Sequence, residues 1–206
     1  MLYRVKPWRM RRFLAALILA PTPALACSVT PEYHLPGNVE LLRKADLVVL
    51  ARVEGDGPDF TVRLHPEKAL KGHLPRQPLT ALGSTEERGR GPWPQIVTPL
   101  NRPHPSAMWG ACVRQAYIKG GLVLALYRHT DRGYVPLDYP FARNVEDVRD
   151  SNDLWPRAAR LYLATLAKPD PDRAFAALAT SLETKEDADS QVIARDIRAN
   201  LPLARP

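Results

Sequence analysis

The chain has 206 residues, of which 45% are hydrophobic and 25% charged, and it carries a formal net charge of +7. Five of its 29 basic residues lie in the first 26 residues, which hold no acid, so the rest has 24 bases against 22 acids. A balance of +2 gives no reason to expect nucleic-acid binding. After residue 26, no segment approaches the roughly 20 apolar residues of a membrane-spanning helix.

Residues 1–26 have the pattern of a secretory signal peptide. A basic segment that includes Arg11 and Arg12 precedes a short apolar run over residues 13–20, and Ala24-Leu25-Ala26 is a small-residue cleavage site. The apolar run is too short to span a bilayer. We therefore expect the mature chain to be periplasmic or secreted. The arginine pair leaves the general and the twin-arginine export routes both open.

The chain has only two cysteines, Cys27 and Cys112, and Cys27 directly follows the expected cleavage point. In an oxidising compartment, two cysteines favour one disulfide. Such a long loop gives up to about 4–5 kcal/mol of stabilisation in the chain-entropy model. The alternative is a lipid anchor on Cys27, although Ala24 stands where lipidation signals usually place leucine. Lipidation would leave Cys112 as a single exported thiol.

The first half of the mature chain predicts a short helix followed by strands. Asn38 is expected to cap a helix over residues 39–44. A nearly continuous β-branched run over residues 45–53 is typical of a buried strand. Alternation over residues 60–65 predicts a half-exposed strand, with a bulge or break at Pro66. A weaker strand is expected over residues 79–82.

Residues 83–110 are rich in proline and glycine and predict a long irregular loop, with Trp93 and Trp109 as expected core anchors. After the glycine turn at 119–121, the apolar run over 122–127 predicts a central buried strand, and a last short strand is expected over 134–137. Three amphipathic helices follow, over residues 154–167, from residue 170 and from residue 190.

This order of elements, strands first and helices last, indicates an α+β fold. Five short strands over about ninety residues fit a small Greek-key β-barrel of the OB type. The expected layout is a signal peptide over residues 1–26, an OB-like barrel over 27–140 and a helical C-terminal extension over 141–206.

Patterns that carry catalysis or metal binding are missing from the sequence. The histidines are dispersed, so each is expected to be an ordinary surface or loop residue. Ser28 and Ser106 have no base that the sequence identifies, and there is no phosphate loop, dinucleotide fingerprint or nucleophile elbow. We therefore expect a protein that is not an enzyme, with no cofactor and no metal of its own. The histidines are His34, His65, His73, His104 and His129.

Four features, taken in order, resemble the netrin-like module of the tissue inhibitors of metalloproteinases and its bacterial relatives. They are a mature N-terminal cysteine in Cys27-Ser28-Val29, the segment ADLVVLARV over 45–53, the segment ALKG over 69–72, and Cys112 ahead of an aromatic, a glycine and an apolar strand. The last three are Tyr117, Gly120 and residues 122–126. The resemblance covers residues 27–137.

The resemblance implies an OB-like barrel with Cys27 bonded to Cys112. It also implies a metalloprotease inhibitor, in which the α-amine and carbonyl of Cys27 bind the catalytic zinc of the target and Ser28 enters its specificity pocket. Val29 stands where the family usually has a second cysteine, and no cysteine follows the strand over 134–137 to bond with it. The alternative is an envelope interaction or structural module whose N-terminus is only stapled. The expected partner is thus a zinc metalloprotease or another envelope protein.

Overall fold

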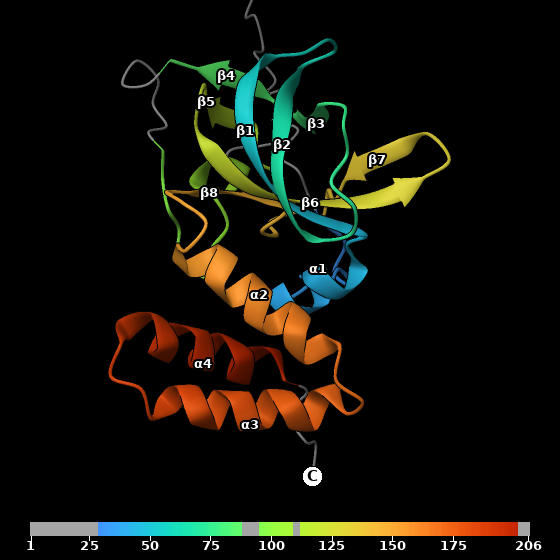
Figure 1. Cartoon of the computed structure of the whole chain (residues 1–206). Helices are drawn as coiled ribbons and strands as arrows, with labels where there is room; N and C mark the ends of the chain where they lie inside the picture. The colour runs from blue at the N-terminus through green and yellow to red at the C-terminus, as the bar shows by residue number, and fades with distance from the viewer. Residues whose placement is uncertain (1–28, 88–94, 109–111, 202–206) are drawn as a thin grey trace, which may run out of the picture.

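The computed structural model describes residues 29–87, 95–108 and 112–201. It has a sheet built by the first two thirds of the chain and a helical layer built by the last third (Figure 1). The expected signal peptide, Cys27, Ser28 and both loop tryptophans lie outside the described residues, so the expectations for them stay predictions. Among the helices that are described, none combines the length and the apolar character needed to cross a membrane.

A six-stranded antiparallel sheet with the order β3-β2-β1-β6-β7 forms the centre of the molecule, and β8 also pairs with β6. The α+β class is therefore confirmed, but this sheet has six strands and is not closed into a barrel, because its path ends at β3 and β7. A separate parallel pair joins β4 to β5. The strands are β1 Leu47–Asp56, β2 Thr61–Lys71, β3 Leu79–Leu82, β4 Ser84–Glu86, β5 Ala116–Ile118, β6 Leu122–Thr130, β7 Gly133–Pro136 and β8 Val145–Val148.

Strand β1 buries side chains on both of its faces. Val48 and Leu50 belong to a large core on the side of the helices, which we call the helix-facing core. Val49 and Val53 belong to a second core between the curled strands, which we call the inner core. Successive side chains of a strand point to opposite faces, so a nearly continuous apolar run is what a strand buried on both sides requires.

Within the described residues, the helical elements are α1 Asn38–Lys44, the 3-10 turn η1 Pro105–Met108, α2 Leu154–Leu166, α3 Pro171–Glu183 and α4 Ala188–Asn200. Helix α2 lies between the sheet and the α3–α4 pair (Figure 1). The expected cap of α2 is confirmed, because the Asp153 side chain accepts from the Leu154 N–H. Helix α4 begins two residues before Ser190 and is capped by Asp187.

Three local expectations need correction. Gly37, not Asn38, is the N-cap of α1, and Asn38 Nδ2 instead donates to Leu100 O and Asp196 Oδ1 at 2.8 and 2.9 Å. Phe60 is not part of the alternating strand, since it is 55% exposed and has a φ of 55° in the turn before β2. The segment expected to be helical from residue 141 begins with β8.

The bulge expected at Pro66 is confirmed. Leu50 pairs with Lys68 and the next residue, Ala51, pairs with Pro66, so one residue of β2 is left without a partner in the register. Proline has no N–H to give to a sheet ladder, and a bulge is one of the places where a strand accommodates it.

Candidate functional site

Of the predicted contact residues, only Val29 lies within the described part of the chain, and it is 37% exposed. Cys112, the expected disulfide partner, is 2% exposed. Tyr33 Oη donates to the carbonyl oxygen of Pro140 at 2.6 Å, and the next residue, Phe141, donates its N–H to the carbonyl oxygen of Cys112. The start of the described chain and Cys112 therefore meet at the same short segment, residues 140–141.

The backbone around this meeting point is held in an unusual conformation. Cys112 and Phe141 have φ angles of 61° and 57°, in the left-handed region. Residues other than glycine adopt this region at a cost of about 1–3 kcal/mol each, so the surrounding contacts must fix them there. We call residues 29–37, Cys112 and residues 139–141 together the amino-terminal platform.

A buried group of charges lies next to this platform and centres on Asp147 of β8, whose side chain is 1% exposed. Its carboxylate accepts from Arg114 Nη2 at 2.7 Å and from the Ile96 N–H at 3.0 Å. Arg114 also donates through Nε to Ala116 O at 2.9 Å, and its guanidinium lies over the Tyr117 ring. The Asp147 carboxylate therefore joins β8 to the loop at Ile96 and to Arg114, which precedes β5.

Glu146, the neighbour of Asp147, points to the other side of β8 and anchors the loop over residues 95–108. Its carboxylate accepts from Thr98 Oγ1 at 2.7 Å and from the His104 N–H at 3.0 Å, with Arg143 Nη2 at 4.0 Å. Burial raises the pKa of Glu146, while Arg143 and the Thr98 hydroxyl act in the opposite direction. These two acids were missed in the sequence, because adjacent acids between valines are typical of a solvated turn.

The structure corrects the expectation for His104, which is buried, and places it beside Ser106. Their Nδ1 and Oγ atoms are 2.8 Å apart, and His104 Nε2 lies 3.6 Å from Asp147 Oδ2. The order serine, histidine, aspartate is that of a nucleophilic triad. However, His104 and Ser106 are 1% and 4% exposed, and the Ser106 N–H also donates to Nδ1. Burial, followed by the charge of Arg114, lowers the pKa of His104 to about 3, so the imidazole is a poor base.

A cavity of about 490 Å³ opens where the sheet fails to close, between β3 and the β6–β7 hairpin. We call it the seam pocket. Its walls are mostly apolar, from Ala81 and Leu82 on one side and Val135 on the other, and its floor holds Arg114 and Asn144. The remaining lining residues are Thr61, Thr80, Val113, Tyr117, Arg128, Thr130, Asp131, Arg132, Pro136, Leu137, Asp138 and Val145.

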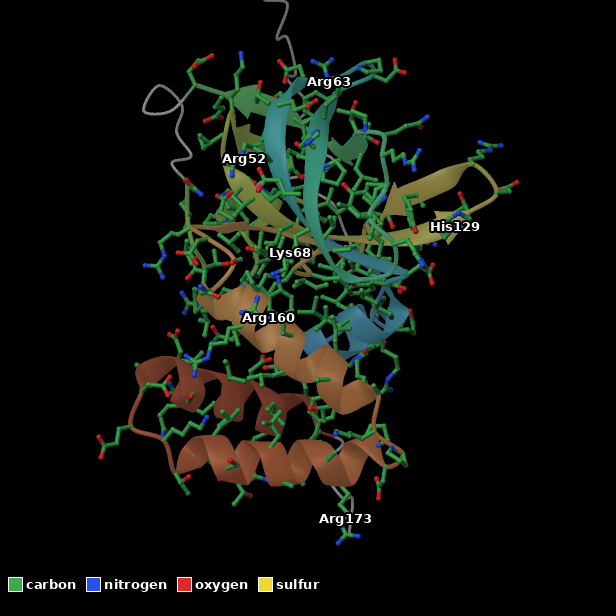
Figure 2. All side chains as sticks on the ribbon, viewed as in Figure 1. Arg52, Arg63, Lys68, His129, Arg160 and Arg173 are labelled. Atoms are coloured by element: carbon green, nitrogen blue, oxygen red, sulfur yellow. The ribbon has the colours of Figure 1, made fainter. Side chains whose placement is uncertain are left out.

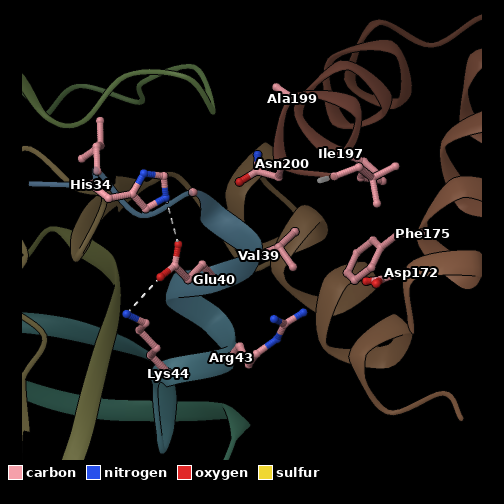
Figure 3. A pocket seen from close by; sticks show the side chains of 13 residues that line it. His34, Val39, Glu40, Arg43, Lys44, Asp172, Phe175, Ile197, Ala199 and Asn200 are labelled. Atoms are coloured by element: carbon pink, nitrogen blue, oxygen red, sulfur yellow. Dashed lines mark ion pairs between the residues drawn. The ribbon is translucent and has the colours of Figure 1, made fainter. Parts of the chain in front are cut away.

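A second cavity of about 600 Å³ lies between α1, α3 and α4 (Figure 3). Three of the titratable side chains that line it, His34, Glu40 and Lys44, lie close to one another. Glu40 accepts from Lys44 Nζ at 2.9 Å and lies 3.5 Å from His34 Nε2. The His34 and Lys44 side chains are 82% and 43% exposed, so water competes for both of them. This cavity is a weaker candidate than the seam pocket.

The arginines and the lysine that are labelled in Figure 2 come from β1, β2, α2 and α3, so they lie on both the sheet and the helical layer. Some are balanced locally, as Arg52 is by Glu67 at 2.6 Å. Within the described ranges, no group of His, Cys, Asp or Glu side chains is arranged to hold a metal ion.

Comparison with known proteins gives no match to a family model, to a curated protein or to a solved structure. The likeness to the netrin-like module therefore depends on the residues quoted for it above.

Proposed function

We propose that the chain is an exported, non-enzymatic binding domain that acts through its mature amino terminus, and that the target is a zinc metalloprotease. An OB-like sheet, open between β3 and β7, is the scaffold in this proposal, and a Cys27–Cys112 disulfide fixes the first residue. The contact strip is Cys27, Ser28 and Val29, with the α-amine and carbonyl of Cys27 directed at the zinc of the target.

The observation that supports this proposal is the amino-terminal platform. Tyr33 and Cys112 both bond to the segment at residues 140–141. Tyr33 is six positions after Cys27, which gives a reach of up to about 20 Å for an extended chain, so Cys27 can reach Cys112. No cysteine within the described residues is free, and the sequence offers only Cys27 as a partner within the chain. Lipidation of Cys27 would not supply that partner.

The test is inhibition of a panel of purified zinc proteases by the mature protein. We expect inhibition that is lost when the amine of Cys27 is acetylated, because an amide nitrogen does not coordinate zinc. A variant with one extra alanine before Cys27 should fail in the same way, because its Cys27 nitrogen is part of a peptide bond. Inhibition that survives both changes would exclude the zinc contact.

The alternative is an envelope interaction module with a stapled N-terminus and no protease target. In that case, the extra alanine leaves partner binding unchanged. The expectation that the chain is not an enzyme has its own test, because the structure places Ser106 beside His104. A fluorophosphonate probe should not label Ser106 in the folded protein, and labelling that is lost in Ser106→Ala would contradict the non-enzymatic assignment.

A further inference from the structure

The seam pocket has a feature that the amino-terminal site does not use: two buried polar atoms that the protein leaves without partners. Within the described part of the chain, Arg114 Nη1 and Asn144 Oδ1 have no hydrogen-bond partner, and both residues line the pocket. Most buried polar groups in folded proteins are paired, and leaving one unpaired is costly. A donor and an acceptor without partners on two residues that line one cavity therefore need an explanation.

The other polar atoms of these two side chains take part in hydrogen bonds within the protein, which hold both side chains in place. Arg114 donates through Nε to Ala116 O at 2.9 Å and through Nη2 to the Asp147 carboxylate at 2.7 Å. Asn144 donates through Nδ2 to Tyr139 O at 2.7 Å. The Arg114 side chain is 4% exposed and is held in place by these bonds and by the Tyr117 ring. The Arg114 guanidinium and the Asn144 amide are thus held in fixed positions at a cavity whose walls are mostly apolar.

We propose that the seam pocket binds a small organic acid that has an apolar body and an N–H or O–H donor. A guanidinium N–H pairs best with a carboxylate oxygen, and the free amide oxygen of Asn144 accepts from the donor. The walls formed by Ala81, Leu82 and Val135 suit a hydrocarbon or aromatic body. A volume of about 490 Å³ lies within the usual range of small-molecule sites.

Apart from Arg114, the charged residues of the pocket lining, which we call the rim, let the ligand enter but do not select it. Arg128 and Arg132 are balanced by Asp131 and Asp138, so the entrance has little net charge. Both unpartnered atoms are buried, so the proposal requires that neighbouring side chains shift when the ligand binds. The rim residues Asp131 and Arg132 are exposed and lie at the turn between β6 and β7, where such a shift disturbs little packing.

The experiment is calorimetric titration of the mature protein with three matched probes: 3-phenylpropanoate, L-phenylalanine and 3-phenylpropanamide. All three have the same aromatic body, the first two carry the carboxylate, and only L-phenylalanine adds a donor next to it. We expect both acids to bind, L-phenylalanine more tightly, and the neutral amide to bind at least about 10-fold more weakly, because it lacks the charge-assisted hydrogen bond.

Two substitutions locate the binding. Leu82 and Leu74 are 43% and 45% exposed, and only Leu82 lines the pocket. Leu82→Trp should fill the entrance and weaken acid binding by at least about 10-fold, while Leu74→Trp should leave it unchanged. Val135→Phe approaches from the opposite wall and gives the same test if Leu82→Trp does not fold by circular dichroism.

Failure of either acid to bind the wild-type protein would overturn the proposal, as would equal affinity for acid and amide or equal binding by both tryptophan variants. Binding of a capped extended peptide, with no binding of the acids, would show instead that the seam accepts a strand. The two proposals are tested separately, because acid binding is measured without any change at Cys27 and the inhibition assay needs no acid.

Discussion

The helix-facing core and the inner core take alternate side chains from the same strand, but they are covered differently. On one side, β1 and β6 share a single core with the α-helices, and this core includes the fully buried Trp155 and Tyr162. On the other side the sheet curls over itself and stops short of closure between β3 and β7. Both sides hold a cavity and buried polar atoms without partners, among them Trp155 Nε1 on the closed side, but on the open side two such residues, Arg114 and Asn144, line the same cavity. Incomplete coverage is therefore the better guide to a ligand site in this fold.

The largest expected effect comes from the ion pair at the edge of the inner core. Asp147→Asn keeps the shape of the side chain but leaves Arg114 buried without a charge partner. Removing one partner of a buried pair costs about 3–5 kcal/mol. The matched control is Asp138→Asn on the exposed rim, which should change the free energy of unfolding by less than about 0.5 kcal/mol. Urea denaturation of both variants measures this, and equal effects would mean that the Asp147 pair does not hold the loop.

Leucine truncations compare the two sides directly. Leu124 is fully buried in the helix-facing core, whereas Leu82 stands at the open seam with 43% exposure. Leu124→Ala should lower the free energy of unfolding by about 3 kcal/mol, because the packed surroundings cannot collapse into the space left. Leu82→Ala should cost less than about 1 kcal/mol. A cost at Leu82 as large as that at Leu124 would show that the seam is closed in solution.

A smaller effect, specific to pH, comes from His104. Its pKa is about 3 in the folded chain against an ordinary 6.5, so above 6.5 it adds nothing to the pH dependence. As pH falls below 6.5, the unfolded chain binds a proton that the folded chain does not, and stability is lost down to about pH 3. The loss reaches about 2 kcal/mol near pH 5. Burial of Glu146 raises its pKa and acts in the opposite direction in the same acid range.

The measurement is therefore a difference between variants. His104→Gln removes the histidine contribution but keeps Glu146, so its free energy of unfolding should fall less between neutral pH and about pH 5 than that of the wild type. His34→Gln, at a side chain that is 82% exposed, should keep the wild-type pH dependence. Parallel curves for wild type and His104→Gln would contradict the buried, neutral state of His104.

What the sequence could predict follows from local patterns. Continuous apolar runs identified β1 and β6, alternation identified most of β2, and capping aspartates identified α2 and α3. Strand β8 was missed because Glu146 and Asp147 are buried only through partners some 30 to 50 residues away in the chain, such as Arg114 and Thr98. Pairing over such distances leaves no local signal.

The two candidate sites also differ in whether a pattern in the sequence predicted them. The cysteine positions and the signal-like leader pointed to the amino terminus, and no comparison tests that prediction. No pattern pointed to Arg114 and Asn144, since an isolated arginine and an isolated asparagine are typical of a solvated loop. The His104-x-Ser106 spacing is visible in the sequence, but its burial depends on the loop over residues 95–108 folding onto β8.

The most direct test of the account is the intact mass of the exported, mature protein, recorded before and after reduction. We predict a chain that begins at Cys27, carries no lipid and gains one hydrogen per sulfur only on reduction. A fatty-acid adduct on Cys27, or a mass that reduction leaves unchanged, would contradict the proposed link between the amino terminus and Cys112.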